Sequence, residues 1–238
     1  FEEALANDKR SQRVRIVFSE TLQNPGVTAV DIVRLYKAIE TENRRRPDDR
    51  KIWLVIDNTF AGPTCCQPLR VIEKIRDQGQ PLTAVVIESL TKVINHRATG
   101  LGGAAVVPWA LYRELVMHRR IEGGVLAPQQ MTDLLWNSIP MLSSVVAQMQ
   151  ANASRLSLLL DRHPLTSGTF SAPRVLYPGL PSYQAKFPFV MDLLRDWDGT
   201  FAPGYMMSAV LRGHEMSLAN VANYIGQRSN TALWAVSL

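Results

Sequence analysis

The sequence predicts an α/β protein with a mostly parallel sheet and helices on both of its faces, followed by a smaller α+β domain. Two short runs rich in β-branched residues, 52–56 and 82–87, are typical of buried strands. A helical pattern separates them, and alternation of strands and helices is typical of a parallel sheet. A chain of 238 residues can form one large domain or two small ones. We expect a large domain over residues 1–145 and a smaller one over 146–238.

The elements before and between these strands follow from the same patterns. Residues 2–10 resemble the end of a helix, and 13–18 alternate as a strand does. Thr28 is expected to cap a helix whose apolar residues share one face. A further helix is expected over 68–77.

The remaining pattern predicts a short strand over 104–107, after which Pro108 occupies the first turn of a helix. Residues 131–162 are expected to be largely helical, with a break at Pro140. Beyond them the pattern changes to strands and loops typical of an α+β domain. There we expect strands over 174–177 and 205–211 and a helix over 217–227.

Composition excludes several classes of function. Apolar residues make up 46% and charged residues 20%, as in ordinary soluble globular proteins. No apolar run approaches the roughly 20 residues of a membrane span, and no signal peptide is visible at Phe1, so we expect no membrane partner and a cytoplasmic location. The net charge of +5 raises nucleic acid as a partner, but the basic clusters are dispersed among acidic residues and lack interleaved aromatics. We therefore expect solvated helix faces and no nucleic-acid binding.

The cysteine and histidine content gives no metal site. Cys65 and Cys66 are adjacent and are the only cysteines, so we expect free, packed thiols in a reducing compartment. The four histidines are scattered and have no ligand spacing, and we assign no metal.

Lys92 is the first candidate for catalysis. It follows the strand over 82–87 by a few residues, in the run Glu88-Ser89-Leu90-Thr91-Lys92. A lysine at the mouth of an apolar strand is desolvated, which favours its neutral and nucleophilic amine. Beside hydroxyls that can hold a phosphate, such an amine suits a Schiff base with pyridoxal phosphate (PLP). The alternative is a solvated lysine in a Ser/Thr loop.

Asp57 is the second candidate, because it ends the strand over 52–56. Ligands of open α/β sheets bind outside the carboxyl ends of the strands, where Asp57 and Lys92 would both lie. PLP needs this pair: a carboxylate that keeps the ring nitrogen protonated and a lysine that carries the aldehyde. Taken alone, Asp57 is also compatible with a helix cap or a turn.

Four motifs follow one another along the chain. They are Glu20 to Pro25 (ETLQNP), Asp57 to Phe60 with Pro63, Pro68 and Leu69, Ser89-Leu90-Thr91-Lys92 with Asn95, and Tyr177 to Ser182 (YPGLPS). Together they resemble the trans-sulfuration enzymes of the Cys/Met-metabolism class of PLP enzymes, and the resemblance covers most of the chain in the family's order. It implies the aspartate aminotransferase-like fold of PLP transferases.

The resemblance also implies roles for individual residues. Lys92 matches the Schiff-base lysine that shuttles protons on the substrate, and Asp57 matches the partner of the PLP ring nitrogen. The matching residues that would hold the rest of the cofactor and the substrate are Ser89 and Thr91 for the phosphate, Thr59 beside the cofactor, Asn24 for the ring hydroxyl or substrate carboxylate, and Ser237 for the lysine and substrate.

The implied activity is elimination or replacement at the β or γ carbon of a sulfur- or oxygen-bearing amino acid, as in lyases and transferases that act on carbon–sulfur bonds. The implied assembly is a homotetramer built from dimers, because the family's sites are completed by a neighbouring subunit. The alternative is a non-catalytic member of the family, or a fragment, that serves as an assembly module.

The chain departs from the family in places. His96-Arg97-Ala98-Thr99 stands where the family usually has Gly-His-Ser-Asp, and Gly62 replaces a usual Ser or Thr. Arg97 supplies a permanent positive charge near the expected site, and Thr99 removes a negative one. We expect Arg97 to bind an anionic substrate group or to change a subunit contact; the alternative is a structural ion pair. The family's glycine-rich phosphate loop and stacking tyrosine have no counterpart in this sequence.

Overall fold

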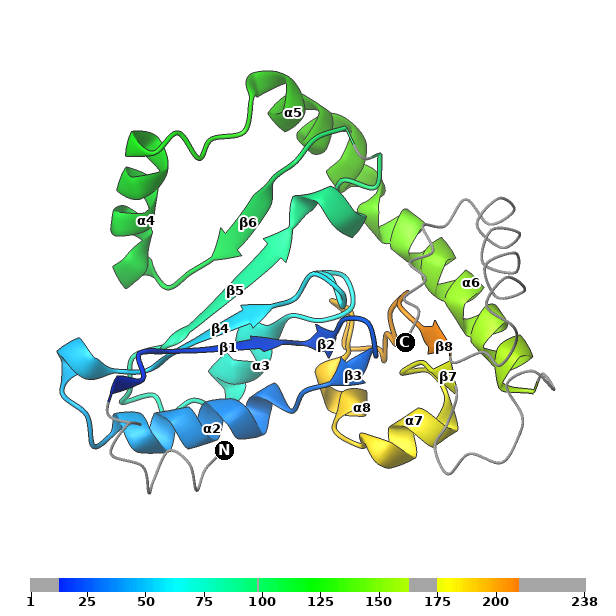
Figure 1. Cartoon of the computed structure of the whole chain (residues 1–238), viewed down its shortest axis with the longest axis horizontal. Helices are drawn as coiled ribbons and strands as arrows, with labels where there is room; N and C mark the ends of the chain where they lie inside the picture. Colours follow the sequence, from blue (N-terminus) through cyan, green and yellow to red (C-terminus); the bar gives the residue numbers. More distant parts are fainter. Residues whose placement is uncertain (1–12, 98, 163–174, 210–238) are drawn as a thin grey trace.

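A computed structural model describes residues 13–97, 99–162 and 175–209 of the protein. Its centre is a four-stranded sheet in the order β1-β4-β5-β6 (Figure 1). The strands are β1 (Ile16–Glu20), β4 (Trp53–Asp57), β5 (Ala84–Ser89) and β6 (Gly103–Val106). The first three are parallel and β6 pairs antiparallel with β5, so the expected α/β fold with a mostly parallel sheet is confirmed.

Two helices connect the parallel strands. Helix α2 (Ile32–Asn43) leads from β1 to β4, and α3 (Pro68–Ile75) leads from β4 to β5. The Oδ1 atom of Asp31 accepts a hydrogen bond of 2.9 Å from the backbone N–H of Arg34, which caps α2. The expected cap at Thr28 is therefore wrong. That residue lies in the small hairpin of β2 (Leu22–Gln23) and β3 (Thr28–Ala29), and α2 begins four residues later.

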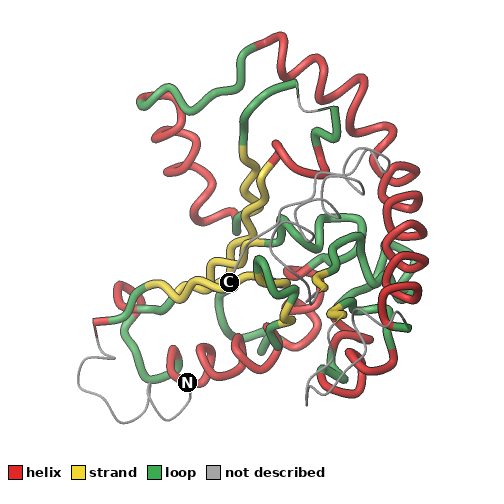
Figure 2. The backbone as a smooth tube through the Cα atoms, turned by 45° about the vertical axis from the view of Figure 1, so that its right-hand side comes forward, coloured by secondary structure: helices red, strands yellow, loops and turns green. Residues whose placement is uncertain are grey.

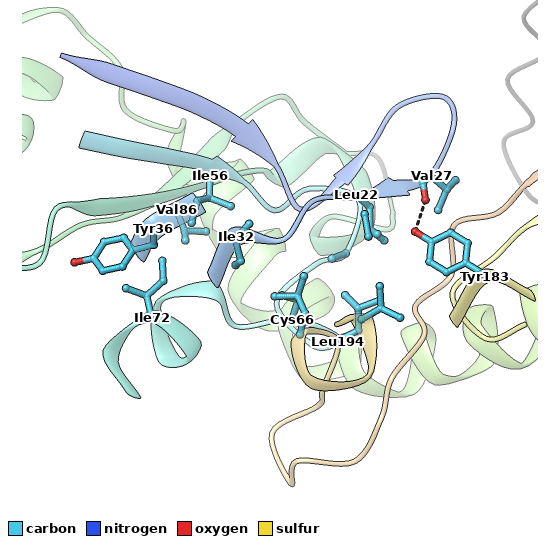
Figure 3. Close-up of a cluster of buried hydrophobic side chains, with 14 of the residues drawn as sticks. Leu22, Val27, Ile32, Tyr36, Ile56, Cys66, Ile72, Val86, Tyr183 and Leu194 are labelled. Carbon is cyan, nitrogen blue, oxygen red and sulfur yellow. Dashed lines mark hydrogen bonds between the residues drawn. The ribbon is translucent and has the colours of Figure 1, made fainter. Parts of the chain in front are cut away.

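The core lies between the sheet and these two helices. Ile56 of β4, Tyr36 of α2 and Ile72 of α3 are completely buried (Figure 3). Leu54 of β4 is completely buried as well. Burial of a large apolar side chain contributes about 1.5 to 3 kcal/mol to the free energy of folding, relative to leaving it exposed. Figure 3 also shows Cys66 within this core; it and Cys65 are free and buried, as expected.

The opposite face of the sheet is open within the described residues. Ile16 and Phe18 of β1 lie on that face and are 63% and 57% exposed. Helix α4 (Trp109–Ile121) stands apart from the sheet, on the side away from α2, and buries no residue (Figures 1 and 2). The described helices thus cover one face of the sheet, where we expected both to be covered.

A largely helical stretch follows α4. It consists of α5 (Pro128–Asp133), a π-helical turn (Leu134–Ser138), a 3-10 turn (Ile139–Met141) and α6 (Leu142–Asp161). Pro140 lies in the 3-10 turn, so the expected break is confirmed. Among the described helices, none has the length and apolar character needed to cross a bilayer.

The last described part packs against the same core. It contains β7 (Val175–Leu176), α7 (Pro181–Lys186), α8 (Val190–Leu193) and β8 (Ser208–Ala209). Tyr183 of α7 is buried, and its hydroxyl donates a 2.6 Å hydrogen bond to the carbonyl of Val27 (Figure 3). The strands expected near 174–177 and 205–211 are confirmed in shorter form. The domain boundary near 145 stays a prediction, and the expected helices over 2–10 and 217–227 lie outside the described residues.

Candidate active site

The carboxyl ends of β4 and β5 bring the first candidate residues to one edge of the sheet. The two strands are parallel neighbours, with Asp57 paired to Ile87. Paired residues of neighbouring strands point to the same face, and alternate residues along a strand share a face. Asp57 therefore lies on the same face as Ser89, opposite the buried face of Leu54 and Ile56.

Thr59 links these strand ends through its backbone and its hydroxyl. Its N–H donates a 2.9 Å hydrogen bond to Oδ1 of Asp57. Its Oγ1 accepts a 2.8 Å hydrogen bond from the N–H of Ser89. The Ser89 hydroxyl lies 2.7 Å from the hydroxyl of Thr91. Four predicted site residues thus form one continuous hydrogen-bonded cluster.

Lys92 follows this cluster in a π-helical turn, Leu90–Ile94. The turn buries Leu90, Val93 and Ile94, and Lys92 between them is exposed. The expectation of a desolvated lysine is therefore wrong for this chain. Lys92 is exposed because the chain leaves the sheet at Ser89, so Lys92 lies on a turn rather than against the apolar strand.

The other predicted residues are less closely tied to the cluster. Asn24 lies in the exposed turn between β2 and β3, where its N–H donates a 3.0 Å hydrogen bond to Oε2 of Glu20. Within residues 13–97, 99–162 and 175–209, no hydrogen bond joins Asn24 to the other candidates. Ser237 lies outside the described residues, so its role stays a prediction.

A buried polar network beneath the cluster was not expected. Asn58 is fully buried, and its Oδ1 accepts a 2.9 Å hydrogen bond from the Thr21 hydroxyl. Its Nδ2 donates to the carbonyl of Cys66 at 3.0 Å and to Oε1 of Glu88 at 2.6 Å. The network therefore ties the chain after β1 to the ends of β4 and β5. Asn58 continues the buried face of Leu54 and Ile56, a position where the alternating pattern could have indicated a buried amide.

Glu88 is the ionisable member of this network. Its pKa is raised to about 7. Burial makes the largest contribution and raises the pKa, the hydrogen bond from Asn58 lowers it, and the nearby Asp57 carboxylate raises it. The burial effect prevails because a carboxylate loses more hydration than a single amide returns. Glu88 thus changes its charge near neutral pH directly before Ser89.

Thr99, in the segment that departs from the family, forms hydrogen bonds with Asn95 and with Asp133 at the end of α5. The hydroxyl of Thr99 donates to Oδ1 of Asn95 at 3.2 Å and also bonds the Asp133 carboxylate. The hydroxyl of Ser138 donates to the same Asn95 oxygen at 3.3 Å. The pKa of Asp133 is lowered mainly by Thr99, and Arg97 contributes a smaller favourable charge. These contacts give Thr99 a packing role; the substrate role of Arg97 stays a prediction.

Comparison with known proteins decides the family. The model of the "Cys/Met metabolism PLP-dependent enzyme" family matches residues 2–191. The chain belongs to this family. It is similar to cystathionine gamma-synthase of Mycobacterium tuberculosis strain H37Rv, at 31% identity over 175 residues, 72% of this chain and 38% of that protein. It is also similar to O-succinylhomoserine sulfhydrylase of Pseudomonas aeruginosa, at 30% identity over 71% of this chain and 36% of that protein.

Solved structures agree with this assignment. Cystathionine gamma synthase from Xanthomonas oryzae has a TM-score of 0.71 at 24% identity and matches 93% of this chain and 49% of its own. The cystathionine gamma lyase CalE6 from Micromonospora echinospora has a TM-score of 0.65 at 27% identity, over 94% of this chain and 50% of its own. The chain thus spans about half the length of these two solved structures. It spans 38% of the Mycobacterium tuberculosis synthase and 36% of the Pseudomonas aeruginosa sulfhydrylase.

The donor set of the cluster fits PLP, the cofactor of the family. Two hydroxyls 2.7 Å apart, Ser89 and Thr91, suit a phosphate, which needs several hydrogen-bond donors. Asp57 on the same face supplies a carboxylate of fixed orientation, because Thr59 holds one of its oxygens. Lys92, exposed one residue after Thr91, supplies a reachable amine. These residue types are what the cofactor's phosphate, ring nitrogen and aldehyde require.

Proposed function

We propose that this chain carries the cofactor half-site of an enzyme that eliminates or replaces a substituent at the β or γ carbon of a sulfur- or oxygen-bearing amino acid. The observation that carries the proposal is the hydrogen-bonded cluster of Asp57, Thr59, Ser89 and Thr91 at the carboxyl edge of the sheet. Family membership and the similar synthases, lyases and sulfhydrylases support this chemistry.

Bound PLP supplies an electron sink that makes the substrate's α-proton acidic. Lys92 would hold the cofactor's aldehyde through its amine, and the freed amine would act as the base that removes the substrate's α-proton. The same amine would carry protons between the α and β carbons of the substrate, while the substituent would leave with the electron pair of its bond to carbon. Asp57 would keep the ring nitrogen protonated. Ser89 and Thr91 would hold the phosphate.

Two further residues belong to the proposed site. Asn24 would bond the ring hydroxyl or the substrate carboxylate, from the turn after β2. Ser237 would contact the lysine and the substrate.

The substrate proposed here is a small amino acid, and the assembly proposed is a homotetramer built from dimers, in which a neighbouring subunit completes each site. Light scattering of the full-length protein with PLP tests the assembly, and a cofactor-bound monomer would contradict it.

The catalytic proposal is tested with the full-length protein, PLP and a panel of substrates. Cystathionine alone tests elimination, through release of a 2-oxo acid. O-succinylhomoserine or O-acetylhomoserine with cysteine tests replacement, through formation of a thioether. We expect turnover of at least one substrate, dependent on PLP and lost in Lys92→Ala. PLP binding without turnover of any member of the panel would favour a non-catalytic assembly module instead.

A further inference from the structure

A tyrosine distant in sequence reaches the centre of the candidate cluster. The hydroxyl of Tyr205 donates a 3.0 Å hydrogen bond to the backbone carbonyl of Thr59. Its ring packs in a second apolar cluster that contains Cys65 and Val93. Burial raises the pKa of Tyr205, and the charges of Cys65 and Glu88 raise it further, so the hydroxyl stays a donor at neutral pH.

The backbone directly before Tyr205 is held by two hydrogen bonds. Gly204 precedes it with φ +79°, a left-handed conformation that favours glycine. The N–H of Gly204 donates to Oε1 of Gln150 in α6 at 3.2 Å, and its carbonyl accepts from the Tyr177 hydroxyl at 3.0 Å. Tyr177 is completely buried and opens the YPGLPS motif. The position of the Tyr205 ring is therefore fixed by α6 and by this motif.

A glycine, Gly62, lies next to the Tyr205 hydroxyl. Gly62, three residues after Thr59, has φ +70°. A Cβ atom at this position would lie 3.4 Å from the Tyr205 hydroxyl and 3.2 Å from Cγ1 of Val93. A side chain here would crowd Val93 and strain the backbone, and it would meet the Tyr205 hydroxyl at ordinary contact distance. Glycine at position 62 thus avoids both costs beside the Tyr205 ring.

We propose that Tyr205 is a positioning residue for the cofactor site: through Thr59 it holds the loop that carries Ser89 and Thr91 in place for a phosphate. The hydroxyl of Tyr205 fixes the Thr59 carbonyl, and the Thr59 hydroxyl accepts from the Ser89 N–H. The Ser89 hydroxyl in turn meets that of Thr91. The phosphate part of this inference rests on the proposed function.

Tyr205→Phe tests the role because it removes only the hydroxyl. In the full-length protein without PLP, we expect amide hydrogen exchange at Ser89 to accelerate by about threefold or more, since its acceptor is no longer fixed. Tyr112→Phe is the matched control, because Tyr112 lies on the exposed helix α4. Ile72→Val controls for general destabilisation, because Ile72 is buried in α3 away from the cluster. In both controls the exchange rate of the Ser89 amide, compared with the rates of the other amides in the same protein, should stay unchanged.

The second readout is the dissociation constant of PLP, measured by absorbance titration. We expect Tyr205→Phe to raise it by about three- to tenfold, where tenfold corresponds to about 1.4 kcal/mol. Thr59→Val removes the hydroxyl that accepts from the Ser89 N–H. The double variant should lose less binding free energy for PLP than the sum of the losses in the two single variants. Wild-type protein that binds no PLP would overturn the proposed function and, with it, the phosphate role. A Tyr205→Phe protein that equals wild type in both exchange and PLP affinity would overturn the role of Tyr205 alone.

Discussion

Replacing Asn58 by leucine removes the amide that joins three strand ends while nearly keeping the side-chain volume. The change leaves the Thr21 hydroxyl and the Cys66 carbonyl without their partner in the protein interior. Each buried polar group left unpaired costs about 1 to 3 kcal/mol. Burial of the leucine side chain offsets part of this loss, so we expect the free energy of unfolding to fall by about 2 to 4 kcal/mol.

Urea unfolding at a fixed protein concentration measures this loss, since association with a neighbouring subunit would shift the apparent stability. Asn137→Leu is the matched control, because Asn137 is exposed and, among the residues that the structure describes, its Nδ2 bonds the side chain of Asp133 alone. We expect that control to stay within about 0.5 kcal/mol of wild type. Thr21→Val, which removes a single bond of the network, should cost about 1 kcal/mol and serves if Asn58→Leu does not fold. An Asn58→Leu protein as stable as the control would refute the reasoning.

Three further predictions concern charge and the proposed ligands. The folded state raises the pKa of Glu88 from 4.5 to about 7, so it binds more protons than the unfolded state between these values and loses stability as pH rises through them. Glu88→Gln, which keeps an acceptor for Asn58, should therefore gain stability relative to wild type from pH 5 to pH 7.5 in urea unfolding. Glu73→Gln should show no such gain over this range, because Arg76 lowers the pKa of Glu73 and its titration in both states lies below pH 5; an equal gain in both variants would contradict the role of Glu88. Thr91→Ala should weaken PLP binding by about five- to twentyfold, 1 to 2 kcal/mol, in an absorbance titration, and an unchanged affinity would remove it from the phosphate site. Arg97→Ala should raise KM up to about tenfold with kcat unchanged if Arg97 binds substrate, and unchanged kcat/KM would leave a structural role.

The sheet and the placement of the candidate motifs could be predicted from sequence because both depend on local patterns. Apolar β-branched runs gave β4 and β5, and the parallel arrangement that follows from their connections put Asp57 and Ser89 at one edge. The hydrogen bonds of Thr59 to both of these residues agree with that expectation.

Contacts between distant parts of the chain could not be predicted in this way. The bond of Tyr205 to Thr59 joins residues far apart in sequence, and nothing in the local pattern around Tyr205 indicates it. The left-handed backbone at Gly62 and its close approach to Val93 give a physical reason for glycine there, which in the sequence was only a departure from the family. The exposure of Lys92 was missed for a related reason, because the π turn that buries its neighbours breaks the expected strand-to-loop geometry.

The central claim is that Lys92 carries the cofactor. Its most direct test is to incubate the full-length protein with PLP, reduce the mixture with borohydride, and locate the labelled lysine by peptide mass spectrometry. We expect a pyridoxyl group on Lys92, no label at that peptide in Lys92→Ala, and a weaker label in Asp57→Ala. A label spread over other lysines, or one that persists unchanged in Lys92→Ala, would contradict it.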